Sequence, residues 1–109
     1  MSSGVLKMKA GSFIGTGAAQ DIKLNFNPTF VHVINTDDLS ECMNHINNDV
    51  STKEGGFKRV AAGTRTALAA AAGITLGDNK FSVGTDASCN DSGKKMLYVA
   101  YECNDQIAS

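Results

Sequence analysis

The stretch "GITLGDNKFSVGT", residues 73–85, decides the fold class of this chain. It places two β-prone segments, 73–76 and 80–85, on either side of the polar connection Gly-Asp-Asn at 77–79. These three residue types tolerate the positive φ values that tight hairpin turns require. The stretch therefore predicts a β-hairpin and, with it, an antiparallel sheet.

The segment "DIKLNF", 21–26, shows the clearest alternation of apolar and polar residues. Successive side chains of a strand point to opposite faces, so Ile22, Leu24 and Phe26 share one face and polar side chains share the other. Pro28 follows, and because it lacks an N–H donor and restricts the residue before it, the chain turns there. We expect a strand with one buried and one solvated face.

Other short β-prone runs are separated by clusters of Gly, Asn, Asp and Ser. The strand candidates among them lie at 5–14, 30–35, 56–61 and 96–103. In 30–35 we expect His32 to point to the face opposite Val31 and Val33. The polar compositions of 47–56 and 86–95 predict loops.

Residues 41–46, "ECMNHI", allow two interpretations. As a strand, the segment places Cys42, Asn44 and Ile46 on one side. As an alternative, it forms the tail of a short turn-helix that begins at Asp38. The strand is the preferred interpretation.

This pattern of many short strands and polar turns is typical of an all-β sandwich or barrel. A chain of 109 residues supports one hydrophobic core. We therefore predict a single β domain over 1–109, an antiparallel β-sandwich or jelly-roll-like barrel with long loops.

Composition narrows the classes of partner. The formal net charge is −1 and the ten basic residues are spread along the chain, their longest runs being pairs, which argues against a nucleic-acid partner. The first residues lack the basic and apolar regions of a secretory signal, and no window approaches the roughly 18 apolar residues of a membrane span. We expect synthesis in the cytoplasm and no membrane partner.

The sequence shows no complete set of catalytic or metal-ligating residues. Cys42 and His45 form a Cys-x-x-His pair, but a stable metal site needs three or four ligands and the other cysteines are isolated. Gly-Thr-Gly at 15–17 lacks the third glycine of a dinucleotide fingerprint, since position 20 is Gln20. We expect no enzymatic activity, no cofactor and no metal.

Four consecutive alanines, Ala69–Ala72, stand between polar or glycine-containing flanks. Thr66 and Gly73 are a possible start and end of a helix, but the segment is too short to be helical without packing. We interpret it as a small-side-chain connection between strands, either extended or a single helical turn, that lies close to a neighbouring subunit.

Two stretches, 15–38 and 60–102, carry a resemblance to a known class of protein. They share a cadence of Gly-Thr-Gly, an alternating strand ending in Phe, a Pro turn, a "VHVIN" strand, and then "GITLG", "VGTD" and "YVA". In this cadence the chain resembles small virion structural proteins of tailed bacteriophages, of the head decoration (cement) type.

The resemblance implies a capsid decoration protein that binds the outer surface of the major capsid protein lattice and stabilises the head. It implies a virion location on the capsid exterior after synthesis in the host cytoplasm, and a homo-oligomer, for which a trimer is the first expectation. An alternative is a tail or fibre component that recognises a host surface. The candidate protein-interface residues are Arg65, Leu68, Ala70, Ala71, Lys53 and Phe57.

Overall fold

The hairpin expected at 73–85 forms in the computed structural model, which describes residues 7–46, 48 and 50–103. Strands β7 (Ile74–Gly77) and β8 (Lys80–Val83) pair antiparallel, with Gly77 opposite Lys80. The connection contains Asn79 at φ 59°, in the left-handed region that asparagine tolerates. The chain therefore forms the hairpin turn at 77–79 that its residue types predict.

Strand β2 (Gln20–Lys23) pairs with β8 and completes a three-stranded sheet in the order β2-β8-β7. The predicted alternation is confirmed: Leu24 and Phe26 are buried and Ile22 packs against the core. The strand ladder ends at Lys23, earlier than expected, because the Leu24 N–H then donates to the carbonyl of Asn79 in the hairpin connection.

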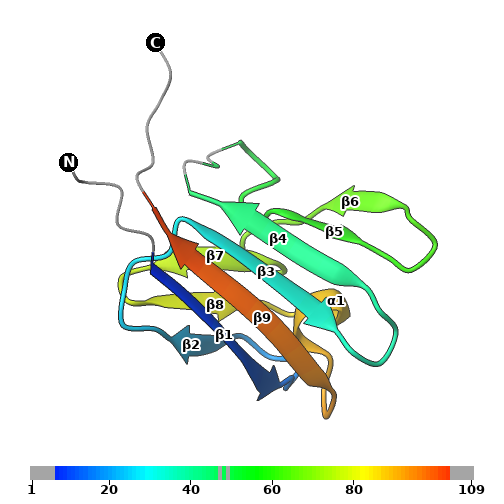
Figure 1. Cartoon of the computed structure of the whole chain (residues 1–109). Helices are drawn as coiled ribbons and strands as arrows, with labels where there is room; N and C mark the ends of the chain where they lie inside the picture. Colours follow the sequence, from blue (N-terminus) through cyan, green and yellow to red (C-terminus); the bar gives the residue numbers. More distant parts are fainter. Residues whose placement is uncertain (1–6, 47, 49, 104–109) are drawn as a thin grey trace.

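The remaining strands form a six-stranded antiparallel sheet that packs against the first one (Figure 1). Its order is β1-β9-β3-β4-β5-β6. The bounds are Lys7–Ile14 for β1, Phe30–Asn35 for β3, Glu41–His45 for β4, Phe57–Arg59 for β5, Arg65–Ala67 for β6 and Lys95–Glu102 for β9. The all-β sandwich is confirmed, whereas residues 5 and 6 of the first strand candidate lie outside the described residues.

Residues 41–46 follow the strand interpretation. β4 pairs with β3, and Cys42 and Asn44 face the core. Asp38 begins no helix, because its carboxylate accepts hydrogen bonds from the backbone N–H and the hydroxyl of Ser40 within a tight β3–β4 turn. Leu39 takes φ 63° in this turn.

The core lies between the two sheets. Phe81, Ile74, Met96, Val31 and Val33 are fully buried there. Burying each such side chain contributes roughly 1.5–3 kcal/mol. In β3, His32 points away from Val31 and Val33, as predicted.

No helix in the described part of the chain is long and apolar enough to cross a bilayer.

The segment 86–95 is not entirely loop. Ala87–Asn90 forms a short helix, α1, whose N-cap Asp86 accepts a hydrogen bond from the Ser88 N–H. Asn90 is fully buried and its amide joins distant loops. Its Nδ2 donates to the carbonyls of Ala18 and Gly84, while its Oδ1 accepts from the Thr16 N–H and from Gln20 Nε2.

The four alanines adopt the second of the two expected forms, a single turn. The N–H groups of Ala72 and Gly73 both donate to the Ala69 carbonyl. Thr66 does not cap this turn, because it lies in β6, a strand that the sequence did not predict. The carbonyls of Ala71 and Ala72 accept from the backbone of Thr85 and Asp86, so this side of the turn packs on its own chain.

Candidate interaction surface

Alternation along the six-stranded sheet assigns its side chains to two faces. The inner face packs on the three-stranded sheet, and we call the opposite one the outer face. No strand or helix of the described residues covers the outer face (Figure 1). The apolar residues that the registers place on it are Met8, Ala10, Ile14, Phe30, Ile34, Met43, Phe57, Ala67, Leu97, Val99 and Tyr101.

Several large apolar side chains of the outer face are open to solvent. The exposed fraction is 59% for Met8, 58% for Ile14 and 42% for Leu97. Tyr101 lies opposite Phe30 in the sheet, and their ring centroids are 6.0 Å apart. Such a contiguous exposed apolar surface is typical of a place where another molecule binds.

A pocket of about 300 Å³ opens on this face where β4 and β5 meet the loop before β5. Met43 and Phe57 lie opposite each other and form the wall contributed by the two strands. Val50 and Lys53 of the loop line the same pocket. The lining is mainly apolar, and Lys53 contributes a positively charged ammonium group to it.

A charged cluster lies beside the pocket on the same face. Glu41 Oε1 is 2.7 Å from His32 Nε2, and Glu41 Oε2 accepts from Arg59 Nε at 2.7 Å and also from Arg59 Nη2. The hydrogen bond from His32 and then those from Arg59 hold the pKa of the Glu41 carboxyl below its usual value. The Glu41 side chain is only 14% exposed. The cluster therefore places a charged group in a defined position within an otherwise apolar face.

The structure brings some of the predicted interface residues together. Lys53 and Phe57 line the pocket, and Arg65 lies on β6 opposite Arg59. Ala70 and Ala71 are exposed on the turn after β6. Leu68 corrects the prediction: it is 5% exposed and belongs to the core, so its side chain is not part of the surface.

The candidate interface residues named from the sequence did not include Phe30, Met43 and Tyr101. An apolar residue at every other position of a strand predicts a buried face, and 30–35 is apolar on both faces apart from His32 and Asn35. The presence of apolar residues on both faces of this strand was the available signal for an exposed apolar surface. When a sheet is covered on one side only, its second apolar face stays exposed.

The Cys-x-x-His pair does not converge. Cys42 points into the core from β4, whereas His45 is on the outer face. The Cys42 thiol instead shares a hydrogen bond with Cys89, and this contact together with burial raises the pKa of Cys42. Over residues 7–46, 48 and 50–103, no group of three His, Cys, Asp or Glu side chains is placed to hold a metal ion.

No protein-family model, no curated protein and no solved structure matches this chain.

Proposed function

We propose that this protein is a bacteriophage head decoration protein that docks on the major capsid protein lattice through the outer face of its six-stranded sheet. The pocket between Met43, Phe57 and Lys53 is the observation that carries the proposal. The resemblance over 15–38 and 60–102 implies binding to a capsid lattice, and the pocket is a site where such binding could occur.

The pocket suits an apolar side chain of the capsid surface. Interfaces draw most of their binding energy from a few well-packed side chains, and aromatic residues and methionine are enriched in them. Phe57 is 37% exposed and Val50 is 51% exposed, so an inserted side chain would remove both from water. Lys53 at the same pocket favours an anchor with a carboxylate beside it.

The charged cluster would orient the protein on the capsid surface. Glu41 is held by His32 on β3 and Arg59 on β5, so its position is fixed before a partner arrives. Arg65 lies opposite Arg59 and makes no ion pair with any described residue, which leaves its guanidinium available to a carboxylate of the capsid. A lattice repeats the same contacts many times, so each contact is sufficient at modest affinity.

The test mixes the full chain with expanded, undecorated shells assembled from the cognate major capsid protein, and sediments them. We expect the wild type in the pellet. Phe57→Asp places a charge in the pocket and should weaken binding by about 30-fold or more, the scale of an interface hot spot.

The matched control is Leu39→Asp. Leu39 is 63% exposed and lies in the β3–β4 turn rather than on the outer face. It should bind the shells like the wild type. A wild-type protein that stays in the supernatant refutes the capsid role, and equal losses for the two variants refute the pocket as its site.

A tail or fibre protein that recognises a host surface is the second candidate. Sugar-binding sites present aromatic platforms, and the neighbouring rings of Phe30 and Tyr101 on the outer face favour this candidate. Antibody labelling of intact virions separates the two: label on the head supports decoration, and label on the tail supports host recognition.

A further inference from the structure

Strand β1 is a free edge of the six-stranded sheet, and among the described strands it pairs only with β9. The N–H of Gly15 donates to Lys94, and the carbonyl of Gly15 accepts from Gly93. Since backbone groups of a strand alternate in direction, the odd-numbered residues of β1 bond to β9. The free edge therefore carries the N–H and C=O groups of Met8, Ala10 and Ser12 and the N–H of Ile14, whose carbonyl also accepts from Gln20 Nε2 at 3.1 Å.

The same residues place their side chains on the outer face. Met8 and Ile14 are the most exposed large apolar side chains of any strand. They lie equally far from Gly11, one on each side along β1. β1 runs without a proline and in continuous register with β9, so it is a long regular edge of the kind that attracts another strand.

We propose that β1 pairs antiparallel with β1 of a second copy of this chain, across a two-fold axis at Gly11. In this register Met8 lies opposite Ile14 of the second copy, and Ala10 lies opposite its Ser12. All of these are edge-directed residues, so they form the hydrogen-bonded pairs of a regular ladder. The two sheets then join into one.

Gly11 suits the axis. A Cβ there would lie 2.8 Å from Tyr98 Oη, so the inner side of this position is already occupied by the Tyr98 ring. In the joined sheet Gly11 meets Gly11 of the second copy as a non-hydrogen-bonded pair, the closer of the two antiparallel spacings. Centring the pairing on Ala10 or on Ser12 instead would separate Met8 from Ile14.

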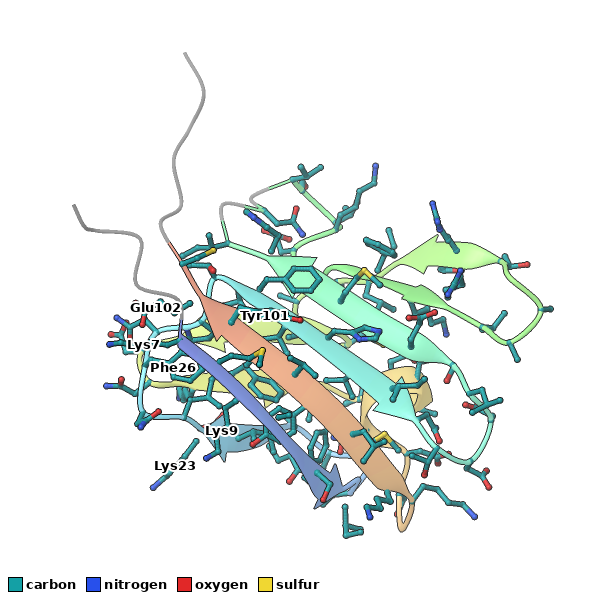
Figure 2. The ribbon with its side chains drawn as sticks, in the orientation of Figure 1. Lys7, Lys9, Lys23, Phe26, Tyr101 and Glu102 are labelled. Carbon is teal, nitrogen blue, oxygen red and sulfur yellow. The ribbon has the colours of Figure 1, made fainter. Side chains whose placement is uncertain are left out.

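Charge does not oppose this pairing. Lys7 is 3.8 Å from Glu102 of its own chain, and Figure 2 shows the two side by side at one end of β1. Lys9 lies opposite Phe13 of the second copy, which puts the two Lys9 positions about 13 Å apart along the ladder. This exceeds the screening length of about 8 Å at physiological salt.

The edge is also accessible. Residues 7–10, Ser12 and Ile14 are exposed, and a hollow of about 430 Å³ at the start of the strand lies between Lys7 and Met8 and the segment after β2. Pairing would make the outer faces of the two copies continuous. The inference concerns the free protein and stands independently of the capsid role.

Sedimentation velocity of the full chain over a range of concentrations tests the pairing. We expect a reversible dimer. Ala10→Pro removes an edge-directed N–H that β9 does not use, and should raise the dimer dissociation constant by about tenfold or more. Ala67→Pro is the matched control, because the Ala67 N–H points to the opposite free edge, beyond β6.

A charge-pair experiment tests the register. The M8K/I14K double variant places like charges opposite each other and should be monomeric, whereas M8E/I14K restores attraction and should dimerise again. Near-ultraviolet circular dichroism confirms that each variant is folded. A wild-type monomer or trimer, an equal effect of both proline variants, or the same behaviour of both charge variants overturns the proposal.

Discussion

The sandwich has two outward faces that differ in chemistry. On the three-stranded sheet the outward side chains are polar: Asp21 accepts from Lys80 Nζ at 3.0 Å and from the Ser82 hydroxyl at 2.5 Å. On the six-stranded sheet they are mainly apolar around the Glu41 cluster, and a pocket opens among them. The first face is satisfied by its own hydrogen bonds and by water, whereas the second gains free energy when another surface covers it.

The largest expected effect on stability comes from removing the Asn90 amide, which links the loops that connect the two sheets. Asn90→Ala removes the side-chain partner of the Thr16 N–H and of the buried Gly84 carbonyl, while the Ala18 carbonyl keeps its bond from the Thr16 hydroxyl. Each lost partner costs about 1–3 kcal/mol, so the free energy of unfolding should fall by about 2 kcal/mol or more. Urea unfolding measures it.

Asn25→Ala is the control for that change, because Asn25 is an exposed asparagine in the segment after β2. It should leave the urea midpoint unchanged. A loss below about 1 kcal/mol for Asn90→Ala would show that the amide network is dispensable, and the two faces would then be held by apolar packing alone.

A smaller effect is expected from the carboxylate of the outer face. Because the folded pKa of Glu41 is lowered from 4.5, the carboxylate stabilises the fold above pH 4.5. This contribution is lost as the pH falls through the folded pKa. Glu41→Gln should therefore reduce the free energy of unfolding at pH 7 and flatten its dependence on pH below 4.5. Urea unfolding at a series of pH values checks this, and an unchanged pH profile contradicts it.

The smallest effect is expected on the polar face. The pKa of Asp21 is lowered as well, by the Ser82 hydroxyl first and Lys80 next. Its side chain is 51% exposed, so water replaces much of what the carboxylate provides. Asp21→Asn should shift the urea midpoint at pH 7 less than Glu41→Gln does. The reverse order would mean that the two faces do not differ in how they shield charge.

Local patterns were sufficient for much of the fold. Alternation at 21–26 and turn chemistry at 77–79 depend on neighbouring residues only, and both predictions were confirmed. The strand β6 was missed because its residues are all exposed and do not alternate. Its extended form depends on pairing with β5, the strand just before it in the chain, and residues 65–67 alone carry no sign of that pairing. Helix α1 was missed because four residues have no helical stability of their own.

The candidate surface was predicted in part. Lys53 and Phe57 were singled out in and next to the predicted middle loop, and they do share a pocket. Leu68 was misplaced, because an apolar residue next to exposed neighbours gives no sign of which way it turns. Met43 and Phe30 come from strands whose facing direction becomes known only when the second sheet is placed.

The sequence by itself determined that this chain is built from short antiparallel strands, because alternation and turn residues act over a few positions. Only the tertiary structure decided which apolar face is buried. Three strands cover one side of the six-stranded sheet, and no strand or helix of the described residues covers the other. The packing of the sheets therefore makes Val31 and Val33 core residues and leaves Phe30, Met43 and Phe57 around a pocket on the outer face.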